Sequence, residues 1–324
     1  MASIHDFKLD AAQLSRVGTE LARPESVIAQ PDGTLFISDA RGLITRRAPN
    51  GDQALFGNPV GEPNGLAMDP QGRIVIAAME GGKLLRIDAD GANETVVLDS
   101  FEGQPLGSVN FVFCDRRGRH WVAVSTRQNH WWPAVMNPLN DGYILLIDEN
   151  GDVRKVADGI NFSNECRLDA DEAYLYVAET MSSRVIRFPV REDGSLGERE
   201  VFGPESLGHG AYIDGIAFDA EGNLWLTTVA RNGVMVISPD GEASTVFEDV
   251  NPTGLDNAVA KINDHTIMPP DLAGCAGPNA QLLTSICFAG PDLRTVYVGS
   301  LAMPHLLTFQ SPTAGLPMSH WSTP

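Results

Sequence analysis

A short sequence motif that recurs along the chain constrains the fold more than any other feature of the sequence. Its fullest copy occupies residues 212–226, where an apolar run leads into an Asp-x-x-Gly turn and then into a second apolar run. This order is typical of two antiparallel strands joined by a tight turn. Recurrence of one such unit at intervals of roughly 40–50 residues indicates a repeat architecture.

The copies of this motif share a polar residue eight positions before the turn glycine. Four copies keep that glycine, a fifth has Glu172 in its place, and a sixth is aligned on its following strand. Each polar residue precedes an apolar segment, so an ordinary role at a strand start is the alternative to a shared site. The six aligned residues are Glu25, Asn64, Asn110, Asn164, Asp214 and Ser285.

The spacing of the copies predicts an all-β fold, a six-bladed β-propeller with four-stranded antiparallel blades around a central channel. The 32 glycines and 21 prolines suit such a turn-rich chain. Because the first strand of each blade lines the channel, equivalent residues at the strand starts would converge at one end. We expect one domain over residues 1–324, with the strand-like segment 14–18 completing the last blade and removing an exposed edge.

The net charge of −19, from 23 basic and 42 acidic residues, argues against two classes of partner. Phosphate backbones and anionic membrane surfaces would both be repelled, so we expect no nucleic acid and no membrane. No apolar run approaches the roughly 18 residues of a membrane span, and the N-terminus lacks a secretory pattern. We therefore expect a cytoplasmic protein. The four cysteines show no Cys-x-x-Cys spacing, and a single disulfide among them is left open.

An aromatic insertion interrupts the third copy of the repeat. It covers residues 127–138 and contains Trp131 next to Trp132. Loops on a rigid scaffold often carry function. We expect the two indole rings either to form a wall or lid over the channel mouth or to pack on a neighbouring blade.

A second irregular segment links the fifth and sixth copies over residues 250–283. We expect a short helix over 255–262, and we expect Pro269 and Pro270 to interrupt any structure after it. This linker is predicted to be a surface excursion. It is also the candidate surface for contacts in a homo-oligomer.

The aligned residues form an oxygen-rich set. Glu25 and Asp214 supply carboxylates, and Asn64, Asn110 and Asn164 supply neutral amide oxygens. Two carboxylates at a narrow channel mouth repel each other unless a cation or a shared proton relieves the repulsion. Calcium prefers six to eight oxygen ligands, magnesium and manganese also accept oxygen, and zinc is less natural without His or Cys. We predict one divalent cation, Ca²⁺ first, with Mn²⁺, Mg²⁺ or Zn²⁺ as alternatives.

A divalent cation with open positions favours hydrolytic chemistry. It polarises a carbonyl or phosphoryl oxygen, and a neighbouring carboxylate such as Asp214 can accept a proton from water. The sequence has no Gly-x-Ser-x-Gly elbow and no phosphate-binding P-loop. A serine hydrolase and a P-loop nucleotide hydrolase are therefore disfavoured.

At these residues the chain resembles the regucalcin/gluconolactonase family of six-bladed propellers, the senescence-marker-protein group. The resemblance extends from about residue 23 to residue 310. Its motifs are individually weak but fairly specific when they occur together in this order. They lie at residues 23–27, 110–118, 160–164, 174–178, 214–225 and 283–293.

The resemblance implies a divalent metal held by Glu25, Asn164 and Asp214. It implies Asn110 as a substrate contact or a fourth metal ligand, and Asp214 as the base in lactone ring opening. On this basis we expect a lactonase that acts on a small-molecule lactone, with the metal polarising the carbonyl and Asp214 activating water.

Three residues depart from the pattern of the sugar-lactone members. Ser108 stands where an arginine is usual, Phe111 where aspartate is frequent, and Glu165 where glycine is expected. Together with Trp131 and Trp132, Phe111 would make the pocket apolar, which favours a lactone less hydroxylated than gluconolactone and bearing an alkyl or aromatic part. The candidate substrate contacts are Asn64, Asn110, Phe111, Trp131, Trp132 and Ser285.

Three other functions remain open from the sequence. A phosphotriesterase could use the same fold and metal, and fold alone does not separate the two chemistries. A propeller that binds calcium without catalysis is the second alternative. The third is a metal-free condensing enzyme of the strictosidine-synthase type, which the register of Glu25, Asn164 and Asp214 disfavours.

Overall fold

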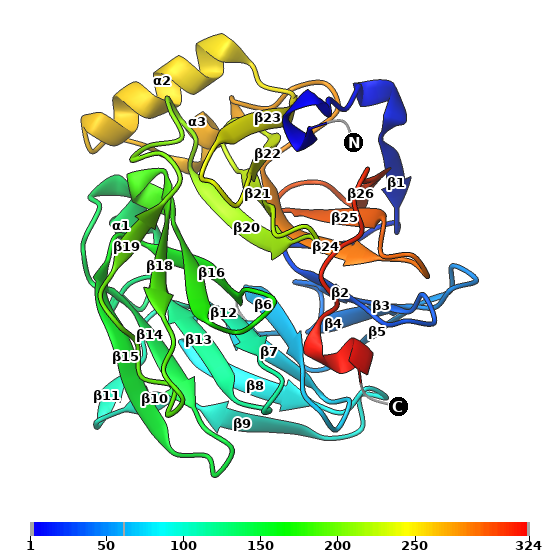
Figure 1. Ribbon diagram of the computed structural model, residues 1–324, viewed down its shortest axis with the longest axis vertical. Coiled ribbons are helices and arrows are strands. Elements are labelled where there is room, and N and C mark those ends of the chain that lie inside the picture. The colour runs from blue at the N-terminus through cyan, green and yellow to red at the C-terminus, as the bar shows by residue number, and fades with distance from the viewer. Residues whose placement is uncertain (1–2, 61, 323–324) are drawn as a thin grey trace.

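The computed structural model describes residues 3–60 and 62–322. Six four-stranded antiparallel sheets are arranged in a ring around a central channel (Figure 1), which confirms the predicted all-β, six-bladed propeller. The first strands of successive blades contact one another around the ring, and β2 lies beside both β6 and β24.

Each blade begins at the channel and adds its strands outward in sequence. Blade one contains β2 (Val27–Ala29), β3 (Leu35–Ser38), β4 (Ile44–Arg47) and β5 (Gln53–Phe56), and blade two β6 (Pro63–Met68), β7 (Ile74–Ala78), β8 (Lys83–Ile87) and β9 (Glu94–Leu98). A small hairpin of β10 (Ser100–Phe101) and β11 (Gln104–Pro105) precedes blade three, which contains β12 (Val109–Cys114), β13 (His120–Val124), β14 (Gly142–Ile147) and β15 (Val153–Ile160). Blade four contains β16 (Ser163–Leu168), β17 (Tyr174–Glu179), β18 (Arg184–Pro189) and β19 (Glu200–Phe202). Blade five contains β20 (Ile213–Phe218), β21 (Leu224–Thr228), β22 (Gly233–Ile237) and β23 (Ala243–Glu248), and blade six β24 (Leu283–Ala289), β25 (Thr295–Ser300), β26 (Leu306–Gln310) and β1 (Ser15–Val17).

The last blade takes its outermost strand from the start of the chain. β1 pairs antiparallel with β26, with Arg16 opposite Leu307 (Figure 1). Leu9, which lies just before β1, is buried among the side chains of blades five and six. The N-terminal segment thereby covers an edge of β26 that would otherwise expose unpaired backbone groups.

The recurring Asp-x-x-Gly turn has a structural explanation in the hydrogen bonds of its aspartate. The Asp219 carboxylate accepts hydrogen bonds from two backbone amides, at Glu221 and Asn223. It also accepts from the Trp225 Nε1–H at 3.0 Å and from the Thr313 hydroxyl at 2.7 Å. The carboxylate therefore closes the turn and satisfies the indole N–H of a fully buried tryptophan on the next strand. Asp115 accepts from Trp121 in the same way.

Among the described residues, three α-helices lie outside the blades: α1 (Trp132–Met136), α2 (Pro252–Asn263) and α3 (Pro269–Ala273). The helix expected over 255–262 is present in α2 and is longer. The expectation that Pro269 and Pro270 interrupt the structure is wrong, because they begin α3, where the first helical positions need no backbone N–H.

The linker is more than the surface excursion that the sequence indicated. Leu255 and Ile262 of α2 are buried against Val135 of α1, beside Phe162. The two irregular segments therefore pack together as one apolar unit outside the ring. No helix in the described part of the chain is long and apolar enough to cross a bilayer, and all four cysteines are free thiols.

The turn aspartates give a stability prediction. We expect Asp219→Ala to lower the free energy of unfolding by roughly 3 kcal/mol, because buried donors on Trp225 and Thr313 lose their acceptor. The matched control is Asp32→Ala, since Asp32 is exposed and accepts hydrogen bonds from the neighbouring Thr34. Its expected loss is below about 1 kcal/mol. Urea unfolding measures both, and equal losses would contradict the assigned role of Asp219.

Candidate active site

Five of the six aligned residues converge in one pocket at the end of the channel where the inner strands begin. The pocket encloses about 290 Å³ of empty space. Ser285, the sixth aligned residue, is buried near Glu165 and does not line the pocket. The lining residues are Arg23, Glu25, Asn64, Met79, Asn110, Trp131, Phe162, Asn164, Asp214 and Leu301.

Irregular strand pairing aims these side chains. In β12, β16 and β20 the regular pairing with the next strand is interrupted at Asn110, Asn164 and Asp214, and β6 and β24 show the same interruption. A bulge adds a residue to one strand and turns a side chain that would otherwise follow the pleat. The repeated bulge is therefore the local feature that points polar side chains into the channel mouth.

Left-handed backbone precedes three of the site residues. Arg23, Glu62 and Phe162 have φ values of 52°, 50° and 64°, and each lies two positions before a pocket residue. Non-glycine residues adopt this conformation at a cost of about 1–2 kcal/mol. The rest of the fold sustains that strain at the entry to the inner strands, as is common at functional sites.

Amide side chains hold the two carboxylates in place. Asn64 donates from Nδ2 to Glu25 Oε1 at 3.0 Å and to Asn110 Oδ1 at 3.2 Å. Asn164 donates from Nδ2 to Asp214 Oδ2 at 3.2 Å. Each carboxylate thus keeps one oxygen bound to an amide and the other oxygen available.

The available oxygens form a set that lacks hydrogen-bond donors. Glu25 Oε2, Asn164 Oδ1 and Asp214 Oδ1 are buried and have no partner among the described residues. Buried acceptors are normally satisfied, so three together need an explanation such as an ion. Two carboxylates and an amide oxygen suit a hard divalent cation. Within the described residues no group of three or more His, Cys, Asp or Glu side chains is placed to hold a metal, so a set of the kind typical for zinc is absent there.

Burial and nearby negative charge raise the proton affinity of both carboxylates. Burial, followed by the charge of Asp214, raises the pKa of Glu25 well above its usual range. Burial, followed by the charge of Glu165, raises the pKa of Asp214 to about 8. The Arg23 guanidinium opposes both shifts. Without a cation, the site therefore favours protonated carboxyls near neutral pH.

Glu165 and Arg23 are site groups that the sequence analysis did not assign. Glu165 is fully buried, and its carboxylate pairs with Arg167 at 3.2 Å. Glu165 follows Asn164 at the position where two other copies of the repeat carry Gly65 and Gly215. A charged residue in place of glycine is the sequence feature that could have identified Glu165 as a site group. Arg23 donates from Nη2 to the Asn64 amide oxygen at 2.8 Å.

The aromatic candidates separate into one pocket residue and two others. Trp131 lines the pocket, and its Nε1–H donates to Glu62. Phe111 is fully buried in the space that the missing side chain of Gly65 leaves, 4.4 Å below the guanidinium of Arg167. Trp132 packs edge-on against Trp131 without lining the pocket. Phe111 and Trp132 therefore lie outside the pocket wall, which corrects their expected direct contact with a substrate.

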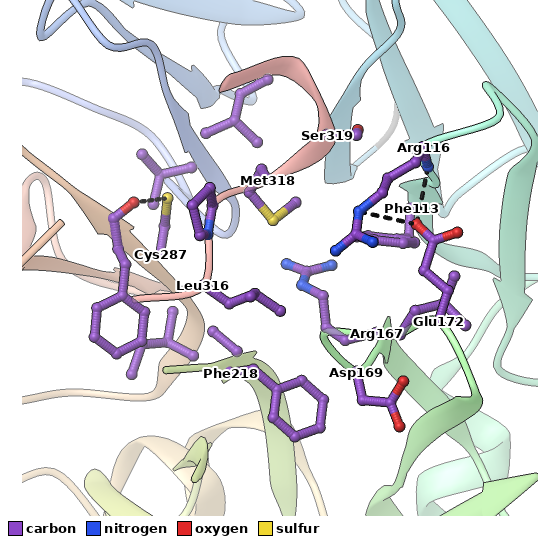
Figure 2. A pocket seen from close by; sticks show the side chains of 17 residues that line it. Phe113, Arg116, Arg167, Asp169, Glu172, Phe218, Cys287, Leu316, Met318 and Ser319 are labelled. Atoms are coloured by element: carbon purple, nitrogen blue, oxygen red, sulfur yellow. Dashed lines mark hydrogen bonds and ion pairs between the residues drawn. The ribbon is translucent and has the colours of Figure 1, made fainter. Parts of the chain in front are cut away.

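A second pocket lies at the other end of the channel, where the inner strands finish. It contains about 670 Å³ of empty space and is covered by Leu316 and Met318 of the C-terminal segment (Figure 2). Arg116, which lines it, is paired with Glu172. Among the aligned residues none lines this pocket, so the polar set that the repeat predicts lies at the first end.

Comparison with known proteins agrees with this fold. Residues 24–249 match the family described as SMP-30/gluconolactonase/LRE-like region. The chain belongs to this family, as its motifs indicated.

Curated relatives include sugar lactonases. The chain is 26% identical over 230 residues to a 6-deoxy-6-sulfogluconolactonase of Pseudomonas putida, covering 71% of this chain and 66% of the relative. It is 24% identical over 230 residues to a gluconolactonase of Zymomonas mobilis, covering 64% of each. The matched segment thus spans slightly less than two thirds of the length of these relatives.

Solved structures show the same fold. A gluconolactonase from Xanthomonas campestris superposes with a TM-score of 0.69 at 20% identity, over 92% of this chain and 89% of the other. A calcium-binding regucalcin from Agrobacterium tumefaciens gives 0.67 at 18% identity, over 94% and 95%. At these identities the likeness establishes the propeller and leaves the chemistry to the site.

The raised pKa of Asp214 predicts how the metal-free protein responds to pH. An unfolded aspartate has a pKa near 3.9, whereas the folded value is about 8. The folded state therefore holds a proton that the unfolded state loses, so the stability supplied by Asp214 declines as pH rises from about 4 to about 8.

Thermal unfolding of chelator-treated protein tests this. Relative to wild type, Asp214→Asn should gain melting temperature steadily between pH 5 and pH 8, because the amide cannot ionise. Glu221→Gln, at an exposed position, is the matched control and should follow wild type. A constant difference between Asp214→Asn and wild type across this range would contradict the assignment.

Proposed function

We propose that this protein is a lactonase whose activity depends on one divalent cation held by Glu25, Asn164 and Asp214. The observation that supports it most is that all three side chains line the same pocket and each has a buried oxygen without a hydrogen-bond partner among the described residues. Calcium is the cation that this oxygen set favours, with Mn²⁺, Mg²⁺ or Zn²⁺ as alternatives. The sugar lactonases among its relatives support the reaction class.

The roles of the protein side chains follow from their contacts. The Asn164 amide holds Oδ2 of Asp214 and so orients the carboxylate that would bind the cation and accept a proton from the attacking water. Asn110 lines the pocket and accepts a hydrogen bond from Asn64, which supports a role in orienting the lactone. When bound, a divalent cation would polarise the lactone carbonyl and favour the ionised carboxylates.

The charges of neighbouring side chains affect how readily Asp214 accepts and releases a proton. Glu165 raises the proton affinity of Asp214 from below, and Arg167 neutralises part of the charge of Glu165. These charges, together with a bound cation, would set the proton affinity of the base, which transfers protons most effectively when its pKa lies close to the working pH. After the ring opens, the proton on Asp214 can return to the leaving alkoxide, so one residue serves both halves of the reaction.

A phosphotriesterase is the second candidate function. The chain is 23% identical over 189 residues to a diisopropyl-fluorophosphatase of Loligo vulgaris, covering 56% of this chain and 59% of the relative. A cation that polarises a carbonyl can equally polarise a phosphoryl oxygen. Parallel assays on both ester classes separate the two functions.

Lactone hydrolysis followed by pH-stat tests the proposal. We expect chelation to abolish turnover and Ca²⁺ or Mn²⁺ to restore it. Asp214→Asn should lower kcat/KM by roughly 10²–10⁴-fold, since it removes both a general base and a cation ligand. Asp256→Asn, at an exposed carboxylate on α2, is the control and should keep wild-type activity.

Two outcomes would contradict the proposal. Turnover that survives exhaustive chelation would remove the role of the cation. If calorimetry detected bound cation while no lactone was turned over, hydrolysis of an aryl phosphotriester would assign the second function. The absence of both activities would leave a propeller that only binds the cation.

A further inference from the structure

A third pocket, the apolar pocket, opens beside Asp214, next to the polar pocket that Glu25, Asn164 and Asp214 line. It contains about 490 Å³ of empty space, and Asp214 and Asn164 line both it and the polar pocket. Trp131 also lines both and stands at their boundary. A substrate whose reacting group lies at Asp214 can therefore extend directly into apolar surroundings.

The walls of this apolar pocket come from the segments outside the regular repeat. Val135 belongs to α1, Ile262 to α2 and Leu272 to α3, while Val229 and Ala230 follow strand β21 of blade five. The two irregular segments thus form one side of a cavity, and the propeller rim forms the other.

Packing behind the walls makes the apolar pocket part of the folded core. Ala258 and Ile267 are fully buried, and Val135 and Ile262 are 7% and 6% exposed. They belong to one apolar cluster that also includes Phe162 of the channel mouth. Such packing keeps the cavity preformed, as is usual for small-molecule sites.

Few polar groups line the apolar pocket, and one of them, the Thr180 hydroxyl, is engaged within the protein. The Thr180 hydroxyl donates to the Ile213 carbonyl at 2.7 Å and accepts from the Asn164 amide at 3.2 Å. Among the described residues that line the apolar pocket, Asp214 is the one charged side chain. A polyhydroxylated sugar chain would lose hydrogen bonds to water in this pocket and find few replacements, whereas an alkyl or aryl group loses none.

We infer that the apolar pocket is a substituent subsite, which accepts the alkyl or aryl group of a lactone whose carbonyl lies at Asp214. The inference rests on the proposed lactonase function and adds the substrate class. The polar pocket then holds the ester, and α1, α2 and α3 select what is attached to it. The residues of these three helices, rather than those of the cation site, then determine which lactone substituent the protein accepts.

A chain-length series tests the subsite. We expect kcat/KM for γ-lactones to rise by roughly threefold to fourfold per added methylene, from γ-butyrolactone to γ-decalactone, until the pocket is filled. Glucono-1,5-lactone, assayed in parallel, should be a poorer substrate than the longer γ-lactones. The holoprotein is used throughout, with the same cation concentration in every assay.

Opposite changes at Leu272, which is half-buried on α3, sharpen the test. Leu272→Asn should flatten the dependence on chain length, and Leu272→Trp should shorten the chain length at which kcat/KM is greatest. Leu55→Asn is the matched control, because Leu55 is 44% exposed on the outer strand of blade one, and its series should match wild type.

The results separate this inference from the proposed function. Efficient turnover of glucono-1,5-lactone with no dependence on chain length would overturn the subsite and leave the lactonase intact. If no lactone is turned over, γ-decalactone is titrated against intrinsic tryptophan fluorescence, since Trp131 lines the apolar pocket. Binding that Leu272→Asn weakens would support the subsite without the reaction, and absence of binding would overturn it.

Discussion

The repulsion between two buried carboxylates at the mouth of the channel is the constraint on which the rest of the site depends. Glu25 and Asp214 come from blades one and five, and burial denies both of them the water that would otherwise screen their charges. Asn64 and Asn164 each donate one amide hydrogen to them, which fixes orientation but leaves one oxygen of each carboxylate without a partner among the described residues. Protons or a cation would supply the remaining compensation, and the two would compete for the same oxygens.

The closed ring of the propeller can hold two buried carboxylates close together because the inner strands that carry the site residues support one another. Bulges at the start of the inner strands bring side chains to the axis, and none of these bulged strands is free to relax, since its neighbours contact it on both sides. Below the site, Glu165 and Arg167 continue the charge pattern into the channel as a buried ion pair. The polar axis is thus enclosed by apolar blades, and the low polarity around it strengthens every electrostatic interaction within it.

The sequence predicted more about the ring than about what covers it. The register of the repeat identified Glu25, Asn64, Asn110, Asn164 and Asp214 as a set, and all five line one pocket. Whether an aromatic residue lines the pocket was harder to predict from the sequence, because the direction of a side chain beside a bulge depends on the neighbouring blade. Phe111 turned toward the space over Gly65 for that reason. Pro269 and Pro270 were predicted to interrupt secondary structure, but proline is also frequent in the first turn of a helix, where both residues lie. Only tertiary packing decides between the two roles.

By itself the sequence determined the number of blades, the polar residue at the start of each inner strand and the oxygen-rich character of the site, because a repeat places equivalent residues at equivalent positions. Only the tertiary structure decided which oxygens lack a partner among the described residues, that Glu165 adds negative charge close to Asp214, and that α1, α2 and α3 join into an apolar wall beside Asp214. These features depend on contacts between segments distant in the sequence: Asn164 and Asp214 are 50 residues apart, and His265 and Met136, which join the two irregular segments, are 129 apart. No local pattern encodes such contacts, since each segment's apolar face is compatible with many partners until the ring closes.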